Sequence, residues 1–452
     1  MEWISGVVQM INKVLWDYAL LFLLCGTGIW FTIRLRFVQV RRFKDGWNKT
    51  FGGLFHKGDQ ADSSGISSFQ ALTTAIAAQV GTGNLAGAAT AIAAGGPGAI
   101  FWMWLSAFFG MATIYAEALM AQKYKTVKEG AVTGGPVYYI RGAFKGTFGK
   151  VLAAIFSVLI IFALGFMGNA VQANSIGDAF ATAFGVNPVI IGVIVAIIAF
   201  FIFAGGITRI ASVTEKMVPF MAFFYIIGSL IVIGVNFREI PHAFYSIVVG
   251  AFNPQALAGG VIGVTVQKAM RYGVARGLFS NEAGMGSTPH AHAIAKVDHP
   301  GDQGCVAIVS VFIDTFVVLS MTALVVITTG VVRPDGSLIG TALTQAAFSS
   351  VFGHFGNIFI AICMFFFAFS TVIGWYFFGE TNVKYLFGQK AVKIYAVIVC
   401  IMIVVGSALK VELVWNMADA FNGMMVIPNL IALLALTGTV VKVSGEYDKK
   451  HK

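Results

Sequence analysis

The sequence contains few charged residues. Asp, Glu, Lys and Arg make up 11% of its 452 residues, against about 25% in soluble domains. A soluble globule of this length needs many more charges on its surface. Hydrophobic residues make up 58% of the chain, so the excess apolar surface is expected to face lipid. The composition therefore argues against a soluble enzyme, a disordered chain and a nucleic-acid-binding module.

Cysteine is also scarce, and the sequence lacks both a common metal-binding motif and a common nucleotide-binding motif. The four cysteines lie far apart in apolar runs, without a Cys-x-x-Cys motif. We interpret them as small membrane-buried residues, and not as a disulfide or zinc framework. They are Cys25, Cys305, Cys363 and Cys400. The phosphate-binding pattern Gly-x-x-x-x-Gly-Lys does not occur. Transport driven by an ion gradient, or passive transport, is therefore expected rather than transport driven by ATP.

Long apolar runs dominate the rest of the chain. A membrane-spanning helix needs about 20 mostly apolar residues, and the runs lack the alternation of barrel strands. The first run, Val14 to Phe31, has no basic segment before it and no small-residue cleavage site after it, so we expect a retained helix. The sequence predicts an all-α polytopic membrane protein with about eleven spans, at 14–34, 66–95, 98–122, 151–180, 186–207, 217–236, 257–280, 305–332, 354–379, 394–410 and 419–441.

The positions of the basic residues predict the orientation in the membrane. With the N-terminus outside, 24 of the 30 Lys and Arg residues fall in inner gaps and 4 in outer gaps. The remaining two, Lys268 and Arg271, lie within a span. Lys and Arg concentrate on the cytoplasmic side of membrane proteins. We therefore predict a multi-pass protein with its C-terminus in the cytoplasm, and we interpret the basic residues as anchors.

Ten spans remain once the first is set aside, and they divide into two groups of five, 66–236 and 257–441. An odd number of helices in each half inverts the second half relative to the first, as in many secondary transporters. The predicted organisation is an N-terminal helix with a basic loop (1–60), a first repeat (61–240) and a second, inverted repeat with a tail (241–452). The leading helix of each half is expected to be broken near mid-membrane.

The first predicted break is Val80 to Gly87, about halfway through its run, and it contains Gly81, Thr82, Gly83 and Asn84. Two glycines cost about 1 kcal/mol each in a helix and favour unwinding. Freed amide groups suit a carboxylate, and freed carbonyl groups suit a cation. Close helix packing through small residues is the alternative.

The second predicted break is Gln267 to Gly273, at the matching offset in the other half, and it includes Met270 and Arg271. A charge at mid-membrane usually faces a cavity or a partner. Arg271 is therefore a candidate for contact with a substrate. The alternatives are an ion pair, with Asp314 or Glu117, and a place in an inner vestibule.

Two further helices carry polar side chains in apolar surroundings. Asn169 and Gln172 share a helix face and are candidates either for binding an amino acid or for linking helices. Ser370 and Thr371 offer two hydroxyl oxygens to a small cation, or bond back to their own helix. Trp375 lies one turn further and either caps a pocket or belongs to an interfacial belt.

The sequence shows no catalytic constellation. The segment around His290, His292, Asp298 and His299 offers at most a weak metal site. A hydrated inner loop is the simpler interpretation of this segment.

Several motifs resemble the alanine/glycine:cation symporter family. They are Gly95-Gly96-Pro97-Gly98-Ala99-Ile100-Phe101-Trp102-Met103-Trp104-Leu105-Ser106-Ala107-Phe108-Phe109-Gly110, Gly81-Thr82-Gly83-Asn84, Arg276-Gly277-Leu278-Phe279-Ser280-Asn281-Glu282-Ala283-Gly284, and Trp415-Asn416 through Ile427-Pro428-Asn429. The resemblance covers almost the whole chain. It implies a bacterial or archaeal inner-membrane protein with a leucine-transporter-type fold, monomeric or weakly oligomeric, that couples sodium entry to uptake of alanine or glycine.

The resemblance also implies roles for individual residues. The substrate carboxylate is expected at Gly81, Thr82, Gly83 and Asn84, with Gln172 and Trp375 beside it. Sodium, carried as a second substrate with no further cofactor, is expected at carbonyl groups of Ala78 and Gly81 and at the hydroxyl groups of Ser370 and Thr371. Met270 and Arg271 depart from the apolar residues of some members. A glutamine-preferring or proton-coupled transporter, a facilitative pore and a non-translocating sensor remain open.

Overall fold

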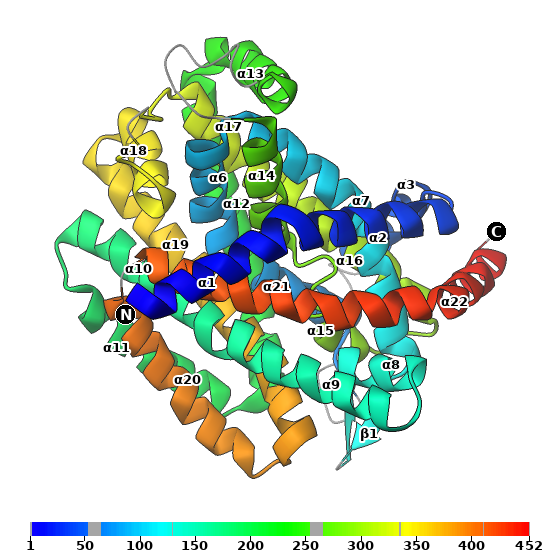
Figure 1. The fold of residues 1–452 in the computed structure, drawn as a ribbon. Helices are drawn as coiled ribbons and strands as arrows, with labels where there is room; N and C mark the ends of the chain where they lie inside the picture. Colours follow the sequence, from blue (N-terminus) through cyan, green and yellow to red (C-terminus); the bar gives the residue numbers. More distant parts are fainter. Residues whose placement is uncertain are drawn as a thin grey trace.

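The computed structural model describes residues 2–52, 65–128, 130–253, 265–333, 336–409 and 411–451. Helices make up nearly all of this part of the chain (Figure 1). The N-terminal span consists of three consecutive helical segments. It runs across the face shown in Figure 1. Two short helices follow it. These elements are α1 (Glu2–Val14), the π-helix η1 (Leu15–Ala19), α2 (Leu20–Arg34), α3 (Val38–Arg41) and α4 (Phe43–Phe51).

The first core helix is broken, as the sequence predicts. It consists of α5 (Ser68–Gln79), the π-helix η2 (Gly83–Gly87) and α6 (Ala88–Gly95). The Ser67 hydroxyl caps the start of α5 by accepting from the Gln70 backbone N–H at 3.1 Å. Regular winding stops at Val80, whose ψ of 87° lies far from helical values.

The remainder of the first half is a run of long helices with one small hairpin. The two strands of the hairpin pair antiparallel, with Val127 opposite Val132. The elements are α7 (Gly98–Lys123), β1 (Thr126–Lys128), β2 (Ala131–Thr133), α8 (Pro136–Ala143), α9 (Gly146–Ile160), η3 (Ile161–Gly168), α10 (Asn169–Phe184), α11 (Pro188–Phe203), α12 (Gly206–Val235), η4 (Phe237–Glu239) and α13 (Ile240–Phe252).

The second core helix is also broken, but at another place than predicted. Helix α14 (Val266–Asn281) is continuous through Gln267–Gly273, so the prediction of a break there is wrong. The helix ends at Asn281 instead, and residues 282–288 form a non-helical segment before the short helix α15 (Pro289–Ala293). Glu282, Gly284 and Gly286 all have positive φ angles in this segment. Positive φ is a conformation that favours glycine, which explains the two glycines.

The second half continues with long helices and ends in a helix docked on the first loop. Arg41 and Arg42 both pair with Asp448 at 2.7 Å. Burial would raise the pKa of Asp448, but these two hydrogen bonds lower it below its ordinary value. The elements are α16 (Pro300–Val311), η6 (Phe312–Leu319), α17 (Ser320–Thr328), α18 (Gly340–Phe352), α19 (His354–Phe387), α20 (Ala391–Ala408), α21 (Val411–Ala435) and α22 (Thr437–Lys450).

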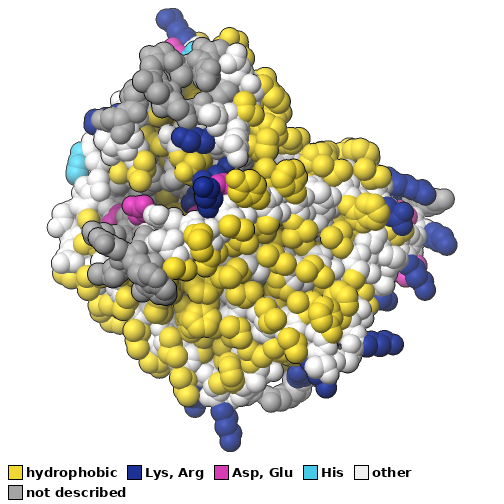
Figure 2. Space-filling model, viewed as in Figure 1, with side chains coloured by type: hydrophobic (Ala, Val, Ile, Leu, Met, Phe, Trp, Pro, Cys, Tyr) yellow, Lys and Arg dark blue, Asp and Glu magenta, His cyan; other side chains and the backbone are white. Residues whose placement is uncertain are grey.

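The surface is that of a membrane protein. Eight helices of the described residues are long and apolar enough to span a bilayer, and α11 is a shorter apolar helix. Large side chains such as Phe201 (64% exposed) and Phe223 (67%) project outward, where lipid would cover them. Figure 2 shows a broad hydrophobic face, with Lys and Arg gathered at the edge near α22 and α8. The count of eleven spans, their orientation and the division at residues 60 and 240 stay predictions.

Candidate functional site

The first break frees peptide groups deep inside the protein, and neighbouring side chains bind them. The Gly81 N–H donates to Asn84 Oδ1 at 2.9 Å. The Thr82 N–H donates to Gln172 Oε1 of α10 at 3.2 Å. Thr82 and Asn84 are fully buried, and Gln172 is 1% exposed. The structure therefore brings together Gly81, Thr82, Asn84 and Gln172, four of the residues predicted from the sequence.

Gly81 lies where three helices approach closely. A Cβ atom on Gly81 would lie 2.3 Å from Thr371 Oγ1 of α19 and 3.2 Å from Gln172 Oε1. The φ angle of Gly81 is not in the left-handed region. The glycine is therefore required by the close approach of α19 and not by backbone strain.

Two polar atoms beside this break have no hydrogen-bond partner within the described residues. They are the Thr82 hydroxyl oxygen and Gln172 Nε2, both buried. A buried polar group without a partner costs about 1–3 kcal/mol, so such groups mark places where a ligand or water binds. A carboxylate could accept from both atoms.

A second polar cluster, of four oxygen atoms, adjoins the break. Thr371 Oγ1 lies 2.9 Å from the Ala77 carbonyl oxygen and 3.1 Å from that of Phe367. Ser370 Oγ lies 3.3 Å and 2.8 Å from the same two oxygens. We call these atoms the oxygen cluster. The carbonyl beside the hydroxyls belongs to Ala77, whereas the sequence analysis named Ala78, which packs instead against Gly374.

Asp314 of η6 joins the first break to α14 and was missed as a site residue. Its carboxylate accepts from Asn84 Nδ2 at 2.7 Å and from Ser280 Oγ at 2.9 and 3.0 Å. Thr315 Oγ1 donates to it at 2.8 Å. An acidic residue inside the apolar run Phe312–Leu319 was the available signal. Asn84 thereby connects the Gly81 N–H to a buried carboxylate.

The second break is held by another buried carboxylate, that of Glu117 on α7. It accepts from the Gly284 N–H at 3.0 Å and the Gly286 N–H at 2.9 Å. Asn429 Nδ2 of α21 donates to it at 2.6 Å, and Tyr139 donates to Asn429 Oδ1. Glu117 is fully buried. It thus satisfies peptide groups that the unwound segment would otherwise leave without partners.

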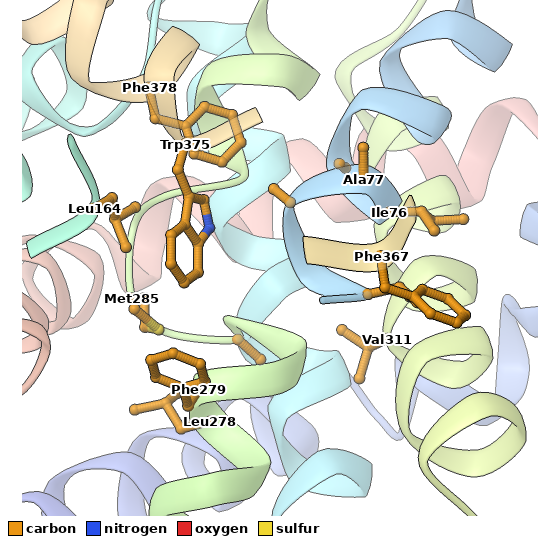
Figure 3. Close-up of a cluster of buried hydrophobic side chains, with 14 of the residues drawn as sticks. Ile76, Ala77, Leu164, Leu278, Phe279, Met285, Val311, Phe367, Trp375 and Phe378 are labelled. Carbon is orange, nitrogen blue, oxygen red and sulfur yellow. The ribbon is translucent and has the colours of Figure 1, made fainter. Parts of the chain in front are cut away.

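Trp375 binds at the second break. Its indole N–H donates to Glu282 Oε1 at the second break, and Ser287 Oγ donates to Glu282 Oε2 at 2.5 Å. The ring of Trp375 lies edge-on to that of Phe279, with 5.6 Å between centroids. Figure 3 shows an apolar wall in which Leu164, Phe279 and Met285 surround Trp375, while Ile76, Ala77 and Phe367 lie across from it.

Arg271 and Met270 lie elsewhere. Arg271 Nε pairs with Asp17 Oδ1 of the N-terminal span at 2.7 Å, so neither Asp314 nor Glu117 is its partner. Nine residues of helix separate Arg271 from Ser280, about 14 Å along the axis. The structure therefore does not bring Met270 or Arg271 into the group around Gly81. Arg276, one of the 24 basic residues that the sequence assigned to inner gaps, lies within α14 and pairs with Asp419 at 2.6 Å.

The interpretation as a hydrated loop is wrong for His290 and His292, whereas Asp298 is exposed and His299 is half-buried. His290 is 1% exposed and His292 is fully buried. His290 Nδ1 lies 2.6 Å from the Ser287 carbonyl oxygen, and Asn382 Nδ2 lies 2.9 Å from His290 Nε2. His299 accepts from the Gly301 N–H at the start of α16. No group of three or more potential metal ligands is found among the described residues.

Comparisons with known proteins show the family of this chain. The model of the sodium:alanine symporter family matches residues 1–452. The sodium/alanine symporter AgcS of Methanococcus maripaludis is 44% identical over 456 residues, covering 100% of this chain and 99% of AgcS. The probable sodium/glutamine symporter GlnT of Bacillus subtilis is 41% identical, covering 99% of this chain and 92% of GlnT.

Among solved structures, MhsT in complex with L-phenylalanine resembles this chain with a TM-score of 0.56. The identity is 13%, and the match covers 86% of this chain and 99% of MhsT. This likeness confirms the predicted all-helical transporter fold. The family match and the full-length relatives together show what class of protein this is. The chain belongs to the sodium:alanine symporter family and is a membrane transporter, not an enzyme.

Proposed function

We propose that the protein takes up a small neutral amino acid, alanine or glycine, by coupling it to inward movement of sodium through alternating access. The observation that carries the proposal is the first break. A Cβ on Gly81 would lie close to both the Gln172 amide oxygen and the Thr371 hydroxyl of the oxygen cluster. One unwound segment can therefore serve both an amino acid and a cation.

The amino-acid site is proposed on the Gln172 side. The buried Gln172 Nε2 and Thr82 hydroxyl would donate to the substrate carboxylate. We place its side chain against the apolar wall of Trp375, Phe279 and Met285. Burying a methyl group against such a wall is favourable, whereas a buried polar side chain needs partners. Alanine and glycine fit these conditions.

The sodium site is proposed at the oxygen cluster. Ala77, Phe367, Ser370 and Thr371 bring four uncharged oxygens together, two from carbonyls and two from hydroxyls. Hard cations bind oxygen ligands of this kind. Sodium binding there would fix α19 against α5 beside Gly81, and would thus shape the amino-acid site next to it.

A glutamine-transporting variant of this function has one supporting observation, the 41% identity to a relative described as a probable sodium/glutamine symporter. Arg271 does not support a longer polar substrate such as glutamine, because it pairs with Asp17 outside the group around Gly81.

The proposed location rests on the distribution of basic residues predicted from the sequence. With the N-terminus outside, 24 of the 30 Lys and Arg residues fall in inner gaps and 4 in outer gaps, and moving Arg276 into α14 leaves this excess in place. This bias still supports a plasma-membrane protein of a bacterium or archaeon with its N-terminus outside.

Radiolabelled alanine uptake into proteoliposomes tests the proposed function. With pH and membrane potential clamped, an inward sodium gradient is expected to raise internal alanine above the external concentration. Without sodium, alanine should at most equilibrate. Accumulation driven by a proton gradient alone would assign the coupling to protons, and equal uptake in all conditions would contradict coupling. Competition by glycine and glutamine in the same assay separates the two substrate proposals.

A further inference from the structure

A polar cavity lies away from the first break. It has a volume of about 340 Å³ and opens between the N-terminal span, α14 and α21. We call it the vestibule pocket; its polar lining includes Asn12, Asp17, Arg271, Arg276, Asn416 and Asp419. On the face in Figure 2, basic and acidic side chains lie side by side near the centre, beside the hydrophobic surface.

Two ion pairs give the vestibule pocket both signs of charge. Arg276 and Asp419 form a bidentate pair, with nitrogen–oxygen distances of 2.9 and 2.6 Å. Arg271 Nε lies 2.7 Å from Asp17 Oδ1. Within the described part of the chain, the two terminal nitrogens of Arg271 bond to no other group, and the side chain is 34% exposed. A guanidinium fork of this kind matches a carboxylate.

The pocket also contains polar atoms that lack partners. Asn12 is 5% exposed, and its Oδ1 has no hydrogen-bond partner among the described residues. Its Nδ2 donates to the Asn416 carbonyl at 2.8 Å, which fixes the orientation of the amide. Arg276 Nε is likewise buried without a partner. One acceptor and one donor on residues that line the cavity therefore lack a partner among the described residues, as polar groups near a ligand site often do.

An aromatic layer separates the vestibule pocket from the first break. The Arg276 guanidinium lies 4.6 Å from the centre of the Trp415 ring. Trp415 packs on Phe279, with 4.8 Å between ring centroids. Phe279 in turn contacts the first break, since a Cβ on Gly83 would lie 3.3 Å from the Phe279 ring. A ligand in the pocket would thus be one layer away from the proposed transport site.

We propose that the vestibule pocket is a second binding site for a zwitterionic amino acid, which rests there before it passes the Arg276–Trp415–Phe279 layer. The terminal nitrogens of Arg271 hold its carboxylate. Asp17 and Asn12 Oδ1 hold its ammonium group. Because both charges of the ligand are matched, anions and cations that carry only one of them bind less well. This inference rests on the proposed function and adds a site to it.

Equilibrium dialysis with radiolabelled alanine at saturating sodium tests the site. The purified wild-type protein is expected to bind two alanines, one of them weakly. Arg271→Gln should bind one and should raise KM for uptake about tenfold with an unchanged maximal rate, since the transport site is intact. Lys268→Gln is the matched control, because it removes an exposed positive charge from the same helix outside the pocket.

Asp17→Asn and Asn12→Ala provide independent variants should Arg271→Gln fail to fold, and both should also bind one alanine. Two alanines bound by all three variants, with KM unchanged, would overturn the proposal. A single alanine bound by the wild-type protein would overturn the vestibule site and leave the proposed function standing. A wild-type protein that binds none and accumulates none would overturn both.

Discussion

Replacing Gly81 by alanine is expected to lower alanine uptake at least about a hundredfold. The new Cβ would lie 2.3 Å from Thr371 Oγ1 and 3.2 Å from Gln172 Oε1. Contacts this short force α5 away from α19 or displace the hydroxyl from the oxygen cluster. Either movement disturbs the proposed amino-acid and sodium sites together. Initial rates of uptake into proteoliposomes, normalised to reconstituted protein, measure the effect.

Gly87→Ala is the matched control for this substitution. Gly87 ends the same unwound stretch, but the nearest atom to a Cβ there is 3.8 Å away, an ordinary contact. Gly87→Ala should therefore transport alanine within about twofold of the wild-type rate. Near-normal uptake by Gly81→Ala would show that the close approach at Gly81 is not needed for transport.

Replacing Glu117 by alanine is expected to abolish transport and to lower the thermal unfolding temperature by several degrees. The substitution removes the acceptor of the Gly284 and Gly286 N–H groups and of the Asn429 amide. Each buried donor left without a partner costs about 1–3 kcal/mol. The unwound segment at the second break then loses its defined shape. Uptake and a fluorescence-detected unfolding curve on the same preparation measure both effects.

Two variants serve as controls for Glu117→Ala. Glu117→Gln keeps an acceptor oxygen, so it should retain more stability than alanine. Glu412→Ala removes an exposed carboxylate and should change neither property. If Glu117→Ala unfolded at the wild-type temperature and transported alanine normally, the carboxylate would have no role in holding the break.

The first break was predictable because its signal is local. Gly81 and Gly83 interrupt an apolar run near its middle, and glycine lowers helix stability wherever it occurs. The hydroxyls of Ser370 and Thr371 were recognisable for the same reason. The second break was misplaced because Lys268 and Arg271 drew the prediction to the wrong segment. Gly284 and Gly286, which take positive φ, carried the correct signal.

The networks around the breaks could not be predicted, because they join residues far apart in the sequence. Asn84 and Asp314 are 230 positions apart, and Glu117 and Asn429 are 312 apart. No spacing rule connects such pairs; only the packing of helices does. For Arg271, the need for a partner followed from its place in a span. Its partner Asp17 was missed because it belongs to the helix outside the two repeats.

The coupling between sodium and alanine tests the central claim, that both bind at one unwound segment, most directly. The dissociation constant of alanine is measured with sodium and with potassium in its place, for the wild-type protein, Thr371→Ala and Thr381→Ala. Thr381 is the control, since it is another buried threonine of α19 that bonds back to its own helix at Phe377.

Sodium is expected to tighten alanine binding at least about tenfold in the wild type and in Thr381→Ala, and hardly at all in Thr371→Ala. Alanine should tighten sodium binding by the same factor, since coupling between two ligands is reciprocal. Alanine binding that is equally tight with and without sodium in the wild type, or a full sodium effect in Thr371→Ala, would contradict the account.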